Sequence, residues 1–453
     1  MKLKKKKANK RFFKARRRPV AGPVSGSFPP VLASNNTPRL RAVGTPFPST
    51  PATILFVLFL FFLPTQFGKH FFPPYSYLNG VRVDYLSPTI YLIDILVFLA
   101  FIFNIKAVIN FFKKKTFLIF FGLLIVNVIL AKNQSVALYQ LIKTAEFLVV
   151  FCLGRELFKF IKEKFTLIVL LLAGVFQLTL AVLQLVSKHS LQGIFYYFGE
   201  RLFNLSTPGI AKATLNGIEF LRPYGTFSHP NSMAGFFLLL YFFVLTYKNF
   251  SKHFFLKYFL LFISSILIFI TFSKVAILTF LILNTFYYIL NTRISCLPCK
   301  IARIAIPIII SIIFFQATTD PLTVDKRIEL VKNSLIILKQ SPFFGVGLGN
   351  YLIVQSQFSS KYFLFFNQPV HNIFLLFICE LGIIITSFLL FQCVKALKSL
   401  KIKKEFLFII LAVVLTGLFD HYWLTLQQNL FLLALIYGVV SNSFLIVRLR
   451  SRS

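Results

Sequence analysis

Acidic side chains are scarce in this sequence, which has only 13 Asp and Glu among 453 residues, against 49 Lys and Arg. Hydrophobic residues make up 57% of the chain, Phe alone occurs 60 times, and the mean hydropathy is +0.78. A soluble domain of this size would need more polar side chains to cover its surface. Long, nearly uncharged runs recur from Ala52 to the C-terminus, and a helix of ~20 such residues crosses a bilayer. The composition therefore predicts an all-α polytopic membrane protein.

Cysteine is also rare, and its positions exclude a disulfide framework. The five cysteines are Cys152, Cys296, Cys299, Cys379 and Cys393. Only Cys296 and Cys299 have the spacing of metal ligands, and no second pair stands nearby to complete a zinc site. We interpret them as an incidental reduced pair in a cytoplasmic loop and expect no bound metal.

The net charge of +36 raises the question of nucleic-acid binding, but the placement of the basic residues argues against it. Lys and Arg stand in short clusters between apolar runs, rather than along one helix face. Every short basic connection falls on the same side of the predicted bundle, and the positive-inside rule makes that side cytoplasmic. Both termini are then cytoplasmic, and the two longest connections, 188–227 and 318–369, face outward.

We predict about twelve transmembrane helices in a domain that covers residues 52–453. The predicted spans are roughly 52–68, 89–107, 116–131, 136–153, 165–187, 228–247, 254–272, 274–292, 301–317, 370–393, 406–420 and 424–447. Residues 1–51 have a basic block followed by a Pro-, Ser- and Thr-rich stretch without apolar periodicity. We interpret them as a disordered cytoplasmic tail that rests on anionic membrane lipid.

Three polar segments fall on the predicted outer face, and the first is Leu221–Asn231. Its prolines and glycine predict a bent entry into a helix, which Thr226 and Asn231 can cap. A helix start with Arg222 beside it suits an anion, because free N–H groups and the helix dipole both favour negative charge. An ordinary capping turn with an interfacial arginine explains the same residues equally well.

The second segment is the outer loop 318–369, for which we expect short helices. Leu330, Leu335 and Ile336 have the spacing of an amphipathic helix on a membrane surface. The glycines between Gly345 and Gly349 could bring backbone N–H groups close to a phosphate, although the stretch lacks the ending of an ATP-binding loop. A glycine-rich turn by itself is weak support for a phosphate site.

The third segment begins the tenth predicted span with His371 and Asn372. A histidine at this boundary can accept a proton at neutral pH, but an interfacial capping histidine is the default interpretation. Glu380 lies about two turns deeper, where exposure to lipid would be costly. We expect its side chain to face the bundle interior and to pair with a basic group from another helix.

These three segments, in this order and spacing, resemble the O-antigen ligase and O-antigen polymerase superfamily of bacterial membrane proteins. The matching residues are RPYGTFSHPN (222–231), then Arg327 before SPFFGVGLGNY (341–351), and HNIFLLFICELG (371–382). The resemblance covers about residues 215–385 closely, and the twelve-span layout accounts for the rest. It is specific to the superfamily rather than to one member.

The resemblance implies a GT-C-like membrane glycosyltransferase that uses an undecaprenyl-pyrophosphate-linked glycan as donor at the outer face of the cytoplasmic membrane. The acceptor would be a growing glycan, a lipid such as lipid A–core, or a protein hydroxyl. Arg222 and Arg327 match arginines that would hold the pyrophosphate, with Thr226 and Asn231 beside them, and His371 matches the catalytic base. No metal or other cofactor would be needed, because the arginines take the place of a cation.

Other polar residues are assigned more weakly. Asn372, Glu380, Asp420 and His421 are candidates for lining the same cavity. Asp84 lacks a second acidic partner in its loop, so we interpret it as structural. Lys274 stands where many relatives have arginine. Lysine keeps the positive charge but cannot form the two parallel hydrogen bonds of a guanidinium group.

Two other classes of protein remain open. A transporter or flippase of lipid-linked glycan would also bind pyrophosphate through basic residues, but it predicts charge along a path through several spans. A scaffold leaves the gathering of the three segments unexplained. The sequence names neither the sugar nor the acceptor.

Overall fold

The chain divides into two units, Met1–Phe47 and Pro48–Ser453. The computed structural model describes residues 50–215, 217–291, 322–358, 367–399 and 404–450, together with 301, 305 and 309. Nearly all of the predicted tail 1–51, the pair Cys296 and Cys299, and most of the predicted span 301–317 lie outside the described residues.

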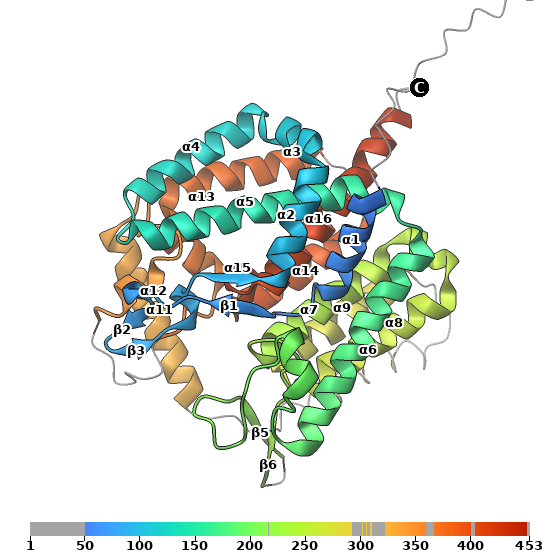
Figure 1. Cartoon of the computed structure of the whole chain (residues 1–453), viewed down its shortest axis with the longest axis horizontal. Coiled ribbons are helices and arrows are strands. Elements are labelled where there is room, and N and C mark those ends of the chain that lie inside the picture. Colours follow the sequence, from blue (N-terminus) through green and yellow to red (C-terminus); the bar gives the residue numbers. More distant parts are fainter. Residues whose placement is uncertain are drawn as a thin grey trace, which may run out of the picture. The chain divides into compact units, whose positions relative to one another are not determined.

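The described part is mainly helical (Figure 1). Its longer helices are α1 (Thr50–Phe62), α2 (Leu92–Phe103), α3 (Ile105–Phe112), α4 (Lys115–Ile129), α5 (Gln134–Leu157), α6 (Glu163–Ser187), α7 (Pro230–Thr246), α8 (Phe254–Ile270), α9 (Lys274–Asn291), α11 (Leu322–Gln340), α13 (Ile373–Ser399), α14 (Lys404–Gly417) and α16 (Gln427–Arg450). Each predicted span except 301–317 overlaps one of these helices.

By length and composition, four described helical stretches are long and apolar enough to cross a membrane. They are Gln134–Phe160, Glu163–Ser187, Lys274–Asn291 and Ile373–Lys395. The pair α2 and α3, bent by 89° at its break, is a fifth candidate. Other apolar helices, such as α7 and α8, are shorter. The protein is therefore a multi-pass helical membrane protein, and the number of twelve spans stays a prediction.

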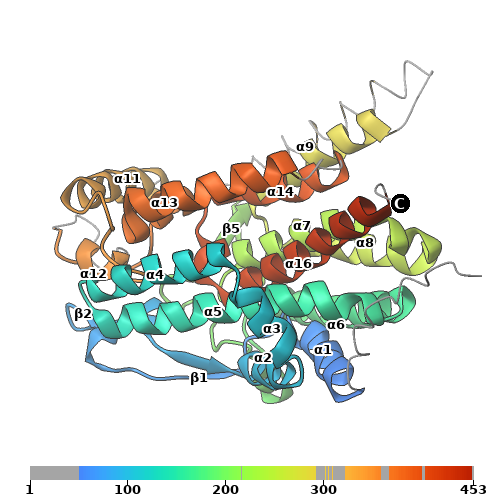
Figure 2. The ribbon, with the colours of Figure 1, turned by 90° about the horizontal axis from the view of Figure 1, so that it is seen from above.

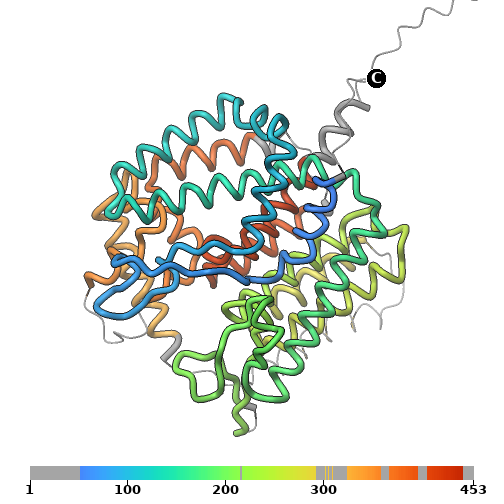
Figure 3. The backbone as a smooth tube through the Cα atoms, viewed as in Figure 1, coloured from blue at the N-terminus to red at the C-terminus, as the bar shows by residue number. Residues whose placement is uncertain are grey.

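The buried core is centred on α7, in which nearly every side chain is buried. This helix packs against α8 and α14 (Figure 2), and α4 packs along both α5 and α13 (Figure 3, teal and orange). The most extensive helix pair is α5 with α16. Their backbones approach closely at Gly438, where an added Cβ would lie 2.2 Å from the carbonyl oxygen of Phe151.

Two of the connections between helices contain short strand pairs. β1 (Gly68–His70) pairs with β4 (Thr89–Tyr91), β2 (Tyr77–Leu78) with β3 (Val81–Arg82), and β5 (Lys212–Leu215) with β6 (Ile218–Leu221), all antiparallel. The predicted span 89–107 therefore begins as a strand and bends at Asn104, where the sequence analysis expects one continuous helix. β6 ends at Leu221, so Arg222 follows directly after this strand, within the first polar segment.

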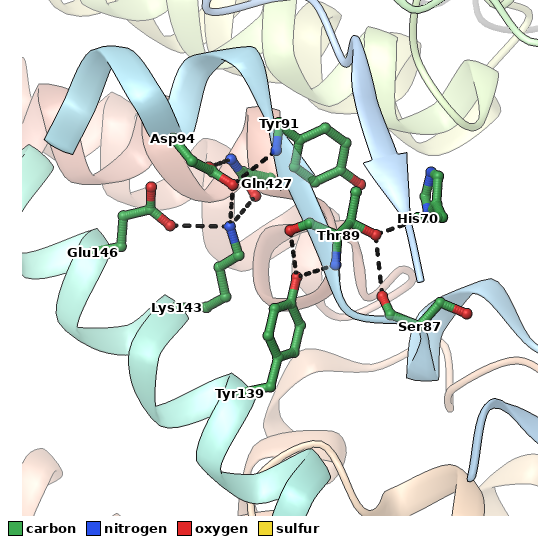
Figure 4. Close-up of polar contacts among 9 residues, drawn as sticks. All are labelled: His70, Ser87, Thr89, Tyr91, Asp94, Tyr139, Lys143, Glu146 and Gln427. Carbon is green, nitrogen blue, oxygen red and sulfur yellow. Dashed lines mark hydrogen bonds and ion pairs between the residues drawn. The ribbon is translucent and has the colours of Figure 1, made fainter. Parts of the chain in front are cut away.

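A partly buried ionic cluster holds α2, α5 and α16 together (Figure 4). Lys143 Nζ lies 2.5 Å from Asp94 Oδ2 and 3.0 Å from Glu146 Oε2, and it donates a 3.0 Å hydrogen bond to Gln427 Oε1. Gln427 also donates to Asp94. Through its contacts with Gln427, this cluster fixes the start of α16. That start follows directly after α15 (Tyr422–Thr425).

α11 lies where the sequence predicts an amphipathic helix, and it packs against α13 (Figure 1). Its buried apolar face includes Leu330 and Ile337. Leu335 and Ile336, which we predicted to face a membrane surface, are 46% and 43% exposed. Contact of this helix with a membrane surface stays a prediction.

The glycine-rich turn of the outer loop is a docking site for a broken helix, which corrects its interpretation as a phosphate cradle. Val346 N and Gly347 N donate to the carbonyl oxygens of Cys379 and Glu380, at 2.9 and 3.1 Å. α13 departs from helical geometry at Gly382 (φ 71°, ψ 178°), a conformation almost restricted to glycine. The N–H groups of Val346 and Gly347 are thus already used by α13, and that of Leu348 donates to Asn127 Oδ1 of α4 at 2.9 Å.

Replacing Gly382 by Ala is expected to destabilise the protein by more than ~2 kcal/mol, through backbone strain and contact. The added Cβ would lie 2.3 Å from Phe343 O. Gly122→Ala in α4 is the matched control, because its Cβ would meet nothing within 4 Å and alanine favours helix. Thermal unfolding in detergent checks both variants. Equal midpoints for Gly382→Ala and wild type would show that the break in α13 is unstrained.

Candidate active site

The first and third polar segments are joined in one chain of contacts by a fourth segment, which lies between α14 and α15. Arg222 Nη2 donates to Asn231 Oδ1 at 2.6 Å, and Asn231 Nδ2 donates to Asp420 Oδ2 at 2.9 Å. Asp420 Oδ1 in turn lies 3.6 Å from His371 Nδ1. The contact chain Arg222–Asn231–Asp420–His371 therefore connects an arginine to a histidine through a carboxylate.

Arg222 is held from two directions. Its Nε donates to the carbonyl oxygen of Thr271 at 2.8 Å, at the end of α8, while its Nη2 contacts Asn231. Burial, and after it the charge of Arg327, lowers the pKa of Arg222 to about 10. Arg222 thus remains a cation at neutral pH, in surroundings where an anion that approached it would be strongly attracted.

The start of α7 presents a neutral histidine beside this arginine. His229 occupies the N-cap position, and its Nδ1 accepts a 3.1 Å hydrogen bond from Asn231 N. Pro230 follows at the first helical position, where its missing N–H costs nothing. Burial, and then the charge of Arg222, lowers the pKa of His229 to about 3, so this ring is uncharged at neutral pH.

Asp420 and His421 lie in the connection between α14 and α15. His421 N donates to Asp420 Oδ1 at 2.8 Å, and His421 Nδ1 lies 2.8 Å from Thr425 Oγ1. Burial alone would raise the pKa of Asp420, but His371, His421 and His229 around it hold that pKa well below its ordinary value. Asp420 is therefore an anion at neutral pH.

His371 directly precedes the helical segment that begins with Asn372 as its cap. Its ring centroid lies 5.1 Å from that of His421. Its Nδ1 is buried and has no hydrogen-bond partner among the described residues, with Asp420 Oδ1 as its nearby acceptor at 3.6 Å. A modest movement of either side chain would close this distance to a hydrogen bond.

Arg327, from α11, adds positive charge to the same site. Together with burial, its charge lowers the pKa of both Arg222 and His421. Arg327 Nε is itself buried without a hydrogen-bond partner among the described residues. Arg327 is therefore close enough to Arg222 and His421 for its charge to act on both.

A comparison with protein families finds a match to part of the chain. Residues 226–390 match the family described as O-antigen ligase. The chain carries an O-antigen ligase domain. This confirms the resemblance found in the sequence and indicates a ligase- or polymerase-type membrane enzyme. No curated protein matches the chain.

The matched residues of the ligase domain include Asn231, Arg327 and His371. Arg222 precedes the matched region, and Asp420 and His421 follow it. The contacts described above join both outlying parts to the ligase domain. The site is thus larger than the matched segment.

Thr226 takes no part in the contact chain from Arg222 to His371. Its side chain is fully buried, donates to Pro64 O at 2.6 Å and accepts from Gln177 Nε2 at 2.7 Å. The hydroxyl group therefore already donates and accepts inside the bundle, and its contact with donor pyrophosphate stays a prediction. Thr226 fixes the bend that presents Arg222 and Asn231.

Asn372 and Glu380 also have internal roles in the ligase domain. Asn372 Oδ1 accepts from the N–H groups of Phe374 and Leu375 at 2.9 and 3.0 Å, and so caps α13. The carboxylate of Glu380 accepts from the backbone N–H groups of Gly349 and Tyr351. The glycine-rich turn, rather than the expected basic group from another helix, is the partner of Glu380.

His371, Asp420 and His421 are a group that could hold a metal ion, since their ligand atoms all lie within 4.8 Å of one another. We still expect the ligase domain to work without a metal, because the charges of Arg222 and Arg327 oppose a further cation there. Transfer activity should therefore survive excess EDTA within a factor of about two. Loss of activity that Zn²⁺ or Mg²⁺ restores would contradict this expectation.

Sequence reasoning missed several residues around the ligase domain's site. His229 was part of the quoted motif but received no role, and Tyr85, whose ring lies 5.5 Å from that of His421, was not noticed. Asp94, Lys143 and Glu146 also went unnoticed, although charged residues inside predicted spans are a recognised signal of a buried functional or structural group.

Proposed function

We propose that this protein is a membrane glycosyltransferase that transfers or polymerises an undecaprenyl-pyrophosphate-linked oligosaccharide. The observation that supports this most directly is the contact chain from Arg222 through Asn231 and Asp420 to His371. It places a cation suited to a phosphate leaving group beside a histidine backed by a carboxylate. The O-antigen ligase domain supplies the reaction class.

In this proposal, Arg222 and Arg327 bind the pyrophosphate of the donor. Charge-assisted hydrogen bonds from guanidinium to phosphate contribute roughly 1.5–3 kcal/mol each. Negative charge grows on the phosphate oxygen as the bond from the anomeric carbon breaks. The two arginines therefore stabilise the transition state more than the bound donor, which is the condition for catalysis.

His371 acts as the general base. The acceptor hydroxyl oxygen forms a bond to the anomeric carbon, its proton passes to His371 Nε2, and undecaprenyl pyrophosphate leaves with the electron pair of the broken bond. Asp420 faces Nδ1, which keeps the proton on that nitrogen and leaves Nε2 free to accept. Asp420 also stabilises the imidazolium that forms.

We place this site on the outer face of the bacterial cytoplasmic membrane, in a GT-C-like bundle of about twelve spans with both termini in the cytoplasm. The basic short connections support this orientation. A glycan polymerase, a ligase to lipid and a protein O-oligosaccharyltransferase would share the chemistry and differ in the acceptor.

The test is transfer by the purified protein in proteoliposomes that contain a fluorescent undecaprenyl-pyrophosphate-linked glycan. A transferase should form a new glycosidic bond and release one undecaprenyl pyrophosphate for each glycan transferred, to a second donor or to an added acceptor. A transporter would move the intact donor across the bilayer without either product. Translocation without bond formation would overturn the proposal.

Replacing Asp420 by Asn is expected to lower kcat by about ten- to a hundredfold, because the neutral amide no longer stabilises the imidazolium of His371. The amide keeps the volume of the side chain, but its single oxygen can accept from only one of Asn231 Nδ2 and His421 N, so thermal unfolding must show that the fold is retained. Steady-state transfer kinetics with thermal unfolding as control check this. An unchanged kcat would remove Asp420 from the mechanism and leave His371 acting alone.

A further inference from the structure

A cationic and aromatic surface lies beside the candidate active site, and nothing in the proposed reaction uses it. We name it the outer rim and define it by His70, Phe72, Arg82 and Arg201. All four side chains are exposed. We propose that the outer rim binds a carboxylate-bearing sugar of the glycan, so that the substrate is an acidic polysaccharide; this rests on the proposed transferase function.

The rim is preorganised by its own contacts. The rings of His70 and Phe72 stack with centroids 6.1 Å apart and 13° between their planes. The guanidinium of Arg82 lies over the Phe72 ring at 4.7 Å from its centroid. His70 Nδ1 is held 2.7 Å from Thr89 Oγ1, which fixes the ring on the β1–β4 ribbon (Figure 4). Rings held in this way lose little entropy when a ligand binds.

Arg201 ties the rim to the first polar segment of the site. It lies between α6 and α7, and its Nη1 donates to the carbonyl oxygen of Ser228 at 2.8 Å. The hydroxyl of the same serine is buried without a partner among the described residues. Arg201 thus stands directly beside the segment that carries Arg222, His229 and Asn231.

The rim has an excess of positive charge. Asp84 is its acidic neighbour among the described residues, and it is paired with Arg82 at 3.1 Å. Partial burial, and then the charges of Arg82 and Arg201, lower the pKa of His70 in spite of Asp84. With Arg82 paired to Asp84, the charge of Arg201 remains to balance negative charge on a ligand.

The rim continues into the active site through Tyr85. This tyrosine follows Asp84 in the chain, its ring contacts that of His421, and the charge of Arg201 acts on its hydroxyl. A donor whose pyrophosphate lies at Arg222 must extend its further sugars away from the anomeric carbon. Exposed rings beside cations suit such sugars, because ring faces pack on sugar carbons while guanidinium binds carboxylate in two-pronged fashion.

Binding to a soluble hexasaccharide that contains glucuronic acid tests the outer rim without any transfer step. The protein is held in phosphatidylcholine nanodiscs, and calorimetry compares this probe with its carboxyl-reduced, neutral counterpart. We expect the acidic form to bind at least tenfold more tightly. Arg82→Gln and Arg201→Gln should each weaken it about tenfold, as loss of a charged hydrogen bond predicts, while Lys188→Gln at the end of α6 should not.

Equal affinity for the acidic and neutral probes, or full affinity in both arginine variants with unchanged thermal unfolding, would overturn the proposal. So would failure of the hexasaccharide to bind while the same variants lose binding to phosphatidylglycerol vesicles, which would make the rim a membrane contact. Because no donor is present, failure of the transferase assay with retained acidic binding would overturn the proposed function alone.

Discussion

Replacing His371 by Ala is expected to lower kcat for glycan transfer by about a hundredfold to ten-thousandfold, which is the usual contribution of a general base. The KM for donor should change by no more than a few-fold, because the arginines that hold the pyrophosphate are untouched. The structure places His371 Nδ1 beside the buried carboxylate of Asp420, so the loss should come from the chemical step.

The measurement is single-turnover transfer by purified His371→Ala and wild type at matched abundance. His189→Ala, an exposed histidine of the connection after α6, serves as the control and should retain full activity. Full transfer by His371→Ala would reduce this residue to the interfacial histidine that the sequence also allowed. The base would then have to be sought elsewhere, with neighbouring His421 as the first candidate.

The sequence predicts the positions of most helices well, because each apolar run is long enough to satisfy its own backbone only as a helix. The predicted span 165–187 corresponds to α6 (Glu163–Ser187), and 274–292 to α9 (Lys274–Asn291). The prediction fails where one apolar run contains both a strand and a helix. The span 89–107 contains a strand that pairs with Gly68–His70, and only that distant partner determines its conformation.

The sequence predicts individual residues of the candidate site, but not the contacts between them. Arg222 and His371 stand out in the sequence because they lie at the starts of apolar helices, where a charged or titratable side chain is costly without a role. Arg327 is found only through the resemblance to the ligase superfamily. Asp420 was assigned only weakly. Its contact with Asn231 depends on how α14 packs against α7, and no local pattern near residue 420 records that packing.

The glycine-rich turn shows a second limit of local patterns. A run of glycines indicates close approach by another group but does not say what that group is. Here the group is the backbone of α13: an added Cβ at Gly345 would lie 2.5 Å from the carbonyl oxygen of Glu380. The break at Gly382 makes those groups accessible, and a single glycine inside an apolar run does not predict a break.

Replacing Arg222 by Ala is expected to lower kcat/KM by about a hundredfold to a thousandfold, comparable to the removal of one donor that stabilises developing charge. Inhibition by added undecaprenyl pyrophosphate should weaken by at least about tenfold, which reports on the leaving group directly. Arg222→Lys should recover only part of the loss. Its single ammonium group cannot reach Thr271 O and Asn231 Oδ1 while also facing a phosphate.

These two variants separate charge from geometry at the pyrophosphate site. If Arg222→Lys matches wild type, the site needs only a positive charge, and the contact with Asn231 serves the fold. If Arg222→Ala keeps full activity and product inhibition, the guanidinium is a capping group for the ends of α7 and α8. The third outcome is an inactive Arg222→Ala variant and an Arg222→Lys variant of intermediate activity. It would show that the hydrogen bonds of Arg222 matter as well as its charge, including the bond to Asn231 that links Arg222 to Asp420 and His371.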